Sequence, residues 1–217
     1  MKQELTIELL KSEAKVFSRK QSEVLSSDLY GVTDGKAVGT YLEHKFQEYL
    51  KTKYSYIQGN SAKGIDFPGL GVDMKVTKYT QPQSSCPFKF ASQKIYGLGY
   101  SLIVFVYNKK DDLENQTGQL IIDHAIFINK ERTGHYQTTS GLRKIIKNDG
   151  NIGDILAFFE ERMLPVGDIE ANELAEEVLT NPPLVGYLTI SNALQWRLQY
   201  SRAIEKAGAV NGVFKIK

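Results

Sequence analysis

Residues 63–77 read KGIDFPGLGVDMKVT, and the rest of the chain is organised around this stretch. Two short runs that alternate apolar and polar residues flank the segment PGLG. Because Pro and Gly mark turns and alternation at period two marks strands, the stretch predicts a β-hairpin. A four-residue turn places Phe67 opposite Val72, and Asp66 opposite Asp73.

The predicted hairpin brings two carboxylates and an ammonium group together. Directly opposed residues have Cβ atoms about 4.5–5.5 Å apart, where like charges destabilise a sheet, so Asp66 and Asp73 need a compensating cation. Lys75 follows on the same face as Asp73, because side chains two positions apart on a strand share a face. This set suits a metal-dependent phosphodiesterase, in which carboxylates bind Mg²⁺ and an ammonium group lies near the attacking water. The alternative is a surface ion pair between Asp73 and Lys75 on an ordinary hairpin.

The same residues resemble the PD-(D/E)xK nuclease superfamily. Asp66-Phe67-Pro68 followed by Asp73-Met74-Lys75 is similar to its signature, with the residue order of the first half altered. The continuation VDMKVTKYT at 72–80 resembles type II restriction endonucleases of the EcoRV and HincII kind. Acidic-x-Lys occurs at three other places, but only at 73–75 does it lie in an apolar strand with a carboxylate on the partner strand.

This resemblance implies a fold and a set of roles. The fold class is α/β, a restriction-endonuclease-like core with a mixed central β-sheet flanked by helices. Asp66 and Asp73 would bind Mg²⁺, and Lys75 would orient or deprotonate the attacking water and stabilise the charge of the phosphate. The backbone carbonyl of Val72 or Met74 would be a further metal ligand. Only six residues separate the two aspartates in the chain, so the turn between them must be tight.

An amphipathic helix is predicted over 36–51, where apolar residues recur at helical spacing. Glu43 projects at the edge of the apolar stripe, where a carboxylate is costly unless it is paired or bound to metal. The run GKAVGTYLE at 35–43 also resembles the helix before the catalytic strands of HincII-type enzymes, whose glutamate assists the metal site. We therefore expect Glu43 to support the metal site. The alternative is an ion pair with Lys36 or Lys45.

Two polar segments are predicted to contact DNA. The first, around 80–88, is rich in Gln, Ser and Thr, which read base edges, and in the enzymes that the chain resembles the segment after the catalytic lysine approaches DNA. The second, at 130–148, combines hydrogen-bond donors, aromatic rings and positive charge. The alternatives are a polar surface loop and a solvated basic face. The candidate DNA-binding residues are Thr77, Gln81, Gln83, Ser84, Ser85, Lys89, Gln137, Thr138, Thr139, Ser140, Arg143 and Lys144.

The remaining elements follow from periodicity. A helical N-terminal segment covers residues 1–30, and its basic residues are interpreted as a solvated face. His124 lies in a predicted strand and is interpreted as a packing residue rather than a ligand. Strands are predicted over 54–58, as the first strand of the sheet, and over 100–107 and 119–129. A charged loop is predicted over 108–118, and helices over 89–99, 154–164, 168–179 and 191–207.

Length and composition indicate a globular protein. A chain of 217 residues with 41% hydrophobic and 24% charged residues can form a single domain over 1–217, with a helical C-terminal subdomain over 151–217 as the alternative division. The net charge of +2 neither requires nor excludes nucleic acid. The single cysteine, Cys86, has no cluster of Cys and His around it, so a zinc site is not expected. With no signal peptide and no long apolar run, we expect a cytoplasmic protein without a membrane partner.

These observations together predict a Mg²⁺-dependent type II restriction endonuclease acting on double-stranded DNA. Because one chain carries one site and both strands must be cut, a homodimer with two-fold symmetry is expected. A cognate DNA methyltransferase is expected in the same system, with no stable complex implied. The alternatives are a structure-specific or repair nuclease with the same core, and a non-catalytic DNA-binding module with the same fold.

Overall fold

The computed structural model describes residues 2–59, 64–87, 89–192 and 195–217. The chain divides into two compact units. The first comprises Met1–Gln83, Ser101–Ile128 and Ala207–Lys217, and the second comprises Ser84–Tyr100 and Asn129–Lys206. The single domain expected from length stays a prediction, as does the C-terminal subdomain.

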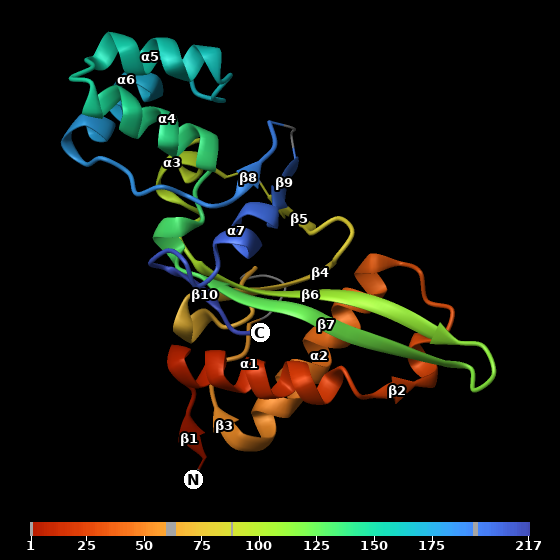
Figure 1. The fold of residues 1–217 in the computed structure, drawn as a ribbon. Coiled ribbons are helices and arrows are strands. Elements are labelled where there is room, and N and C mark those ends of the chain that lie inside the picture. The colour runs from red at the N-terminus through yellow and green to blue at the C-terminus, as the bar shows by residue number, and fades with distance from the viewer. Residues whose placement is uncertain (1, 60–63, 88, 193–194) are drawn as a thin grey trace. The chain divides into compact units, whose positions relative to one another are not determined.

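A mixed β-sheet forms the centre of the first unit (Figure 1). Its strands run in the order β10-β7-β6-β4, and β2 pairs with the beginning of β7, at Gly118 and Gln119. β4 and β6 are parallel, whereas β6/β7, β7/β10 and β2/β7 are antiparallel, so the predicted mixed sheet is confirmed. The strands are β2 (Leu25–Ser26), β4 (Val72–Lys78), β6 (Ser101–Asp112), β7 (Thr117–Ile128) and β10 (Val213–Lys215).

The long strands β6 and β7 extend further than the sequence indicated. Asn108 to Asp112 pair with Ile121 to Thr117, so the predicted charged loop over 108–118 shrinks to the turn at its tip. The ladder continues because each strand residue has a partner on the neighbouring strand, which satisfies the backbone groups even where the side chains are charged. The predicted strand over 54–58 is wrong as a member of this sheet, because β3 (Tyr54–Ser55) pairs with β1 (Gln3–Glu4) in a separate two-stranded sheet.

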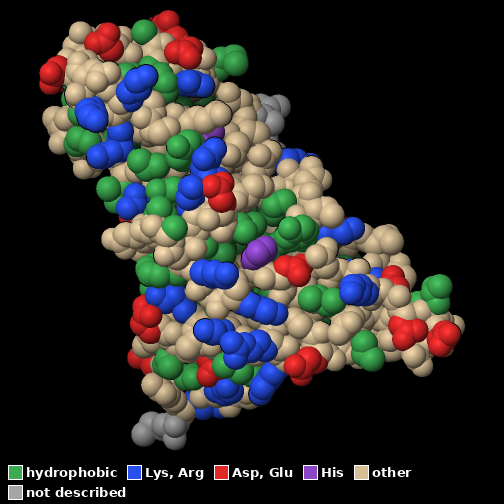
Figure 2. All heavy atoms as spheres, in the orientation of Figure 1, with side chains coloured by type: hydrophobic (Ala, Val, Ile, Leu, Met, Phe, Trp, Pro, Cys, Tyr) green, Lys and Arg blue, Asp and Glu red, His purple; other side chains and the backbone are tan. Residues whose placement is uncertain are grey.

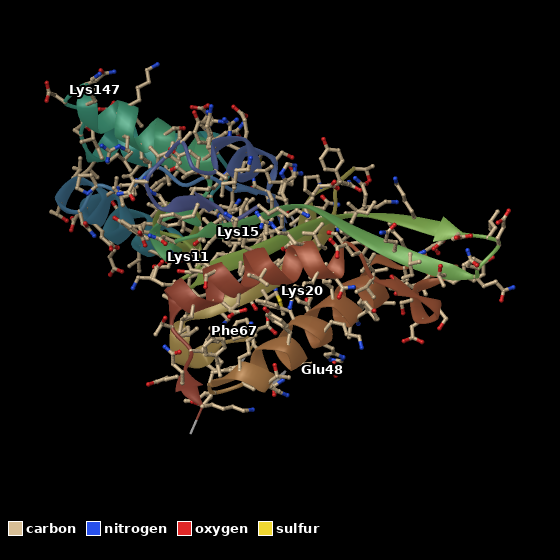
Figure 3. The ribbon with its side chains drawn as sticks, turned by 60° about the horizontal axis from the view of Figure 1, so that its bottom comes forward. Lys11, Lys15, Lys20, Glu48, Phe67 and Lys147 are labelled. Carbon is tan, nitrogen blue, oxygen red and sulfur yellow. The ribbon has the colours of Figure 1, made fainter. Side chains whose placement is uncertain are left out.

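Two helices, α1 (Ile7–Gln21) and α2 (Gly35–Lys53), lie side by side along the sheet (Figure 3). Asp34 begins α2 as its N-cap, because its carboxylate accepts hydrogen bonds from the N–H groups of Lys36 and Ala37 at 3.1 and 3.3 Å. The apolar stripe of α2 is buried, as predicted, and joins one core with both helices and the sheet. That core includes Leu10, Phe17, Leu42, Phe46, Leu50, Met74, Ile103 and Phe105.

The predicted tight turn connects α2 and its following segment to β4. Phe67 and Val72 form an antiparallel bridge, with backbone N···O distances of 3.0 and 3.2 Å. Between them, Pro68–Leu70 is a 3₁₀ turn, and Gly71 closes it with φ +61°, a left-handed conformation that glycine adopts without strain. The hairpin is thus reduced to one bridged pair, and the pairing of Phe67 with Val72 is confirmed.

The second unit contains helices and a small sheet of order β5-β9-β8. The predicted helix over 191–207 is wrong in its first half, because the structure has a strand there. Trp196, Leu198 and Tyr200 are buried while Arg197 and Gln199 are exposed, which is the period of a strand. The elements are β5 (Gln83–Pro87), α3 (Gln93–Tyr96), a 3₁₀ turn (Lys130–Arg132), α4 (Tyr136–Lys147), α5 (Ile152–Glu161), α6 (Asp168–Thr180), β8 (Thr189–Ile190), β9 (Gln195–Gln199) and α7 (Ser201–Lys206).

The surface of the first unit is basic over α1. Figure 2 shows Lys and Arg side chains gathered where Figure 1 draws this helix, and Lys15, Arg19 and Lys20 are exposed. This agrees with a solvated basic face for the N-terminal helix. Across the described part of the chain, no helix has the length and apolar character needed to cross a membrane.

Candidate active site

The tight turn and the start of β4 bring Asp66, Asp73 and Lys75 together. Oδ2 of Asp66 accepts a hydrogen bond from the N–H of Met74 at 2.9 Å, and the carboxyl groups of Asp66 and Asp73 are hydrogen-bonded to each other. Nζ of Lys75 lies 2.7 Å from Oδ2 of Asp73, whose side chain is only 5% exposed. The three residues predicted from one hairpin therefore form one cluster, although only Asp73 and Lys75 lie in a strand, β4, and Asp66 directly precedes the bridged turn.

The electrostatics of this cluster are those of crowded carboxylates. Burial, the hydrogen bond with Asp73 and the negative charges of Asp73 and Glu43 raise the pKa of Asp66 to about 7, although the Met74 N–H opposes the shift. Burial by itself would lower the pKa of Lys75, but the carboxylate of Asp73 beside it outweighs burial and raises this pKa. Lys75 is thus a cation held in place by carboxylates, and the carboxylates outnumber it.

Glu43 reaches the same place from α2. It lines a cavity of about 370 Å³ together with Asp66, Asp73, Met74 and Lys75. Burial raises the pKa of Glu43; Lys75 lowers it, and Asp73 raises it further. Among the described residues, Lys45 pairs with Glu48 at 3.9 Å and Glu43 forms no ion pair, so the alternative pairing of Glu43 with Lys36 or Lys45 is not observed.

Three residues that the sequence patterns do not single out also line this cavity: His44, Gln47 and Gln58. Nε2 of Gln47 lies 3.3 Å from Oδ1 of Asp66, and Oε1 of Gln47 accepts a hydrogen bond from Nε2 of Gln58 at 2.9 Å. Gln47 lies one helical turn after Glu43, so the spacing i, i+4 was the available signal. That spacing places both side chains on one face of α2.

Comparison with known proteins identifies the family. A family model described as "Type II restriction enzyme NspV" matches residues 4–215. The type II restriction enzyme NspV of Nostoc sp. (strain ATCC 29411 / PCC 7524) is 58% identical over 212 residues, which cover 98% of this chain and 96% of the relative. The chain belongs to the type II restriction enzyme NspV family. No solved structure matches the chain.

Membership of the NspV family confirms the prediction of a type II restriction enzyme, a site-specific deoxyribonuclease. The match extends over nearly the whole chain, so both compact units belong to the enzyme of this family. The more specific assignment to the PD-(D/E)xK superfamily stays a prediction, as do the roles of the individual residues.

The donor set of this NspV-family chain fits a hard divalent cation. Among the described residues, no three His, Cys, Asp or Glu side chains are arranged as a ready-made metal cage. Mg²⁺ does not need one, because it is commonly held by one or two carboxylates, water and the phosphates of the substrate. Asp66 and Asp73 supply two adjoining carboxylates whose repulsion a cation would relieve. The side chain of Met74 is buried in the core, so this residue can contribute only its backbone carbonyl.

The predicted DNA-binding residues fall into two groups. Five of them use their hydroxyl groups inside the fold: Thr77 with the backbone of Gln83, Ser84 with the Tyr200 hydroxyl, Thr138 with His135, Thr139 with the backbone of His135 and Gly186, and Ser140 with the backbone of Tyr136. Gln83 is half-buried. The exposed members are Gln81 in the first unit and Ser85, Lys89, Gln137, Arg143 and Lys144 in the second.

Proposed function

We propose that this chain is a Mg²⁺-dependent restriction endonuclease that hydrolyses phosphodiester bonds of double-stranded DNA at a specific short site. Asp66, Asp73 and Lys75 carry the reaction, and Glu43 supports it. The observation that carries the proposal is the cluster of two carboxylates and an ammonium group at the start of β4, in a chain of the NspV family. Two adjoining, largely buried carboxyl groups beside a half-buried lysine are costly unless they serve a site.

The chain's own residues divide the work of hydrolysis. When bound, Mg²⁺ would supply Lewis acidity at the phosphate and a lowered pKa for a coordinated water. Asp66 and Asp73 hold the cation position, and the Met74 N–H fixes one oxygen of Asp66. Lys75, anchored 2.7 Å from Asp73, keeps its ammonium group directed into the cavity, where it orients the attacking water and stabilises charge on the phosphate. Glu43, which lines the same cavity, would accept a hydrogen bond from a water molecule at the metal site.

Two alternatives are weaker. A structure-specific or repair nuclease with the same core would not be expected to share 58% identity over 212 residues with a restriction enzyme. A non-catalytic DNA-binding module would be expected to lose at least one of the four charged residues, and all four are present and line one cavity.

The test is digestion of unmethylated phage DNA with the purified protein. Discrete bands are expected with Mg²⁺ or Mn²⁺. Ca²⁺ is expected to support binding without efficient cutting, because its larger and looser coordination shell activates water less well. Full cleavage in excess chelator would overturn the mechanism, and a smear without bands would favour an unspecific nuclease.

The exposed candidate residues are proposed to contact DNA in two ways. Replacing Arg143 and Lys144 is expected to weaken binding to all sequences and to reduce its salt dependence, because each phosphate contact releases counterions. Changing Gln81 or Gln137 is expected to alter sequence preference instead. Gel-shift titrations in Ca²⁺ that show no effect of either pair would make these residues ordinary surface.

The working unit is proposed to be a homodimer with two-fold symmetry. One cluster of Asp66, Asp73 and Lys75 can cut one strand, and a palindromic duplex site has a matching two-fold axis. Sedimentation on a short cognate duplex is expected to show two chains per duplex. One chain per duplex with simultaneous cleavage of both strands would contradict this. A cognate DNA methyltransferase that protects the host site would act on the same sequence without a stable complex.

A further inference from the structure

Two side-chain amides link the exposed residue Gln58 through the buried Gln47 to Asp66. Gln58 donates from Nε2 to Oε1 of Gln47 at 2.9 Å, and Gln47 donates from Nε2 to Oδ1 of Asp66 at 3.3 Å. Gln47 is 9% exposed, and all three side chains line the cavity of the candidate active site. The other oxygen of Asp66 is occupied by the Met74 N–H.

The polarity of this amide link matches the carboxylate at its end. A carboxylate that binds a metal ion is ionised and only accepts hydrogen bonds, and Gln47 has the matching orientation, with its NH₂ group toward Asp66 and its carbonyl oxygen toward Gln58. Apart from the neighbouring Asp73 carboxyl group, each oxygen of the ionised Asp66 then has one donor, the Gln47 amide or the Met74 N–H, and keeps a lone pair for another partner. The two donors fix the plane of the carboxylate and leave its open lone pairs in the cavity.

Gln47 is itself held at both its side chain and its backbone. Its backbone carbonyl accepts a hydrogen bond from the Tyr56 hydroxyl at 3.1 Å. Burial and then the charge of Asp66 raise the pKa of Tyr56 to about 12, so the phenol stays a donor. The ring of Tyr56 also packs against Phe67, with centroids 5.5 Å apart, next to Asp66 in the chain. Tyr56, which follows α2 in the chain, is thereby anchored to the helix at Gln47, the residue whose side chain contacts Asp66.

We propose that Gln47, oriented by Gln58, is a positioning residue that holds the Asp66 carboxylate in place for the divalent metal ion. This inference rests on the proposed function, because it takes Asp66 as a metal ligand. It assigns the two glutamines to metal affinity rather than to the hydrolytic step. Outer residues that orient metal ligands typically change metal affinity by about 10–100-fold when they are removed.

The experiment measures Mn²⁺ binding to the full chain from the electron paramagnetic resonance signal of free Mn²⁺, and separately the single-turnover cleavage rate against Mg²⁺ concentration. Gln47→Leu keeps the volume of the side chain and removes both hydrogen bonds. It is expected to weaken Mn²⁺ binding by about 10–100-fold and to shift the Mg²⁺ requirement upward, while saturating Mg²⁺ restores most of the rate. Gln58→Leu is expected to act in the same direction and less strongly.

The matched control is Gln21→Leu. Gln21 is a buried glutamine of α1, 5% exposed, that is not among the residues lining the cavity and whose Nε2 has no hydrogen-bond partner in the described part of the chain. This variant is expected to bind Mn²⁺ and cut DNA like the unaltered protein. Asp66→Asn is the positive control, because it removes a proposed ligand and is expected to abolish the tight Mn²⁺ site.

The outcomes separate the positioning role of Gln47 from the proposed function of the protein. Mn²⁺ affinity within about twofold of the unaltered protein in Gln47→Leu, with binding lost in Asp66→Asn, would overturn the positioning role and leave the proposed function standing. Unaltered protein that shows no Mn²⁺ site sensitive to Asp66→Asn would overturn both. If Gln47→Leu does not fold, Gln58→Leu gives the decision, since unchanged Mn²⁺ affinity in that variant overturns the inference. A rate loss in Gln47→Leu that saturating Mg²⁺ does not restore also overturns it.

Discussion

Two carboxylate–lysine pairs in the first unit have the same separation and different surroundings. Glu13 and Lys53 lie 2.7 Å apart, as do Asp73 and Lys75. The Glu13 carboxylate accepts additional hydrogen bonds from the hydroxyls of Tyr49 and Tyr54, at 2.5 and 2.7 Å, so three donors surround one carboxylate. At the candidate active site, by contrast, one lysine faces Asp73 with Asp66 and Glu43 beside it.

The difference in donor supply shows in the pKa values. Burial works to raise the pKa of Glu13, but the hydrogen bonds from Lys53, Tyr49 and Tyr54 outweigh it and lower this pKa. At Asp66 burial and neighbouring carboxylates act together, and the pKa rises to about 7. A carboxylate–lysine pair with surplus donors stabilises the fold, whereas one with surplus carboxylates needs a cation from outside. The distance within a carboxylate–lysine pair therefore does not identify a candidate metal site. The number of hydrogen-bond donors relative to carboxylates around the pair does.

The largest expected effect separates the two clusters by activity. Asp66→Asn and Asp73→Asn keep the shape of the side chains and remove negative charge from the metal position. We expect each to reduce cleavage by roughly 10³-fold or more, since metal stabilisation of the transition state amounts to several kcal/mol and each 1.36 kcal/mol is a factor of ten. Glu13→Gln is expected to cut at close to the unaltered rate. Single-turnover digestion at saturating Mg²⁺ measures all three, and near-normal cleavage by either aspartate variant would place the site elsewhere.

A smaller effect is expected at the wall of the same cavity. Glu43→Gln removes the third carboxylate, which has no ion-pair partner among the described residues and lies near Lys75 and Asp73. Because we assign it to water rather than directly to the metal, cleavage is expected to fall by about 10–100-fold. The same single-turnover assay applies. A loss as large as that of Asp66→Asn would make Glu43 a direct metal ligand instead.

The parts of the candidate site that could be predicted from the sequence are those set by contacts between residues close together in the chain. Asp73 and Lys75 were found because period two in a strand fixes which side chains share a face, and Asp66 because a tight turn fixes the opposed pair. Glu43 was found because its position beside a helical stripe is also local. The contact between Gln47 and Asp66 depends on how α2 packs against the turn, which no local pattern contains.

The wrong assignment of a helix to residues 195–199 also comes from an interaction that no local pattern contains. The residues QWRLQY at 195–200 alternate as a strand, but Leu198 and neighbouring apolar residues also match helical spacing, and only the pairing of β9 with β8 decides between the two. The hydroxyls of Thr77 and Thr139 are consumed by backbone partners inside the fold, at Gln83 and Gly186 respectively. The residue type predicts DNA contact, which stays a prediction for both residues, and the internal partners of their hydroxyls could not be read from the sequence.

Substitutions in the two clusters are expected to affect stability in the opposite order to cleavage: the Glu13 variant loses stability and the Asp66 variant does not. Glu13→Gln leaves donors from Lys53, Tyr49 and Tyr54 facing an amide, and we expect a loss of about 1–3 kcal/mol, or a few degrees in Tm for a chain of this length. Asp66→Asn, measured in chelator, is expected to leave Tm unchanged or higher because it relieves like-charge repulsion. Thermal melts in EDTA give both values.

The control for that measurement is Glu48→Gln. Glu48 lies on the exposed side of α2 (Figure 3), 3.9 Å from Lys45, and its side chain is 67% exposed. An exposed pair of this kind contributes within about ±0.5 kcal/mol, so little change is expected. If Glu13→Gln proved as harmless as Glu48→Gln, the contrast between a satisfied and an unsatisfied cluster would be lost.

The smallest effect is the pH dependence of the Glu13 cluster. The pKa of Glu13 is lowered in the folded protein, so the unfolded chain binds more protons than the folded one between the two pKa values, and stability rises with pH across that range. The stabilisation is complete above the pKa of an unperturbed glutamate, about 4.3, and is lost as pH falls through the lower folded-state value. We therefore expect the difference in unfolding free energy between the unaltered protein and Glu13→Gln to be constant from about pH 8 to pH 5 and to shrink below about pH 4.5. Urea unfolding of both proteins in chelator at each pH measures it. A difference that instead grew as pH fell would mean that Glu13 is protonated in the folded protein, and the two clusters would then be alike.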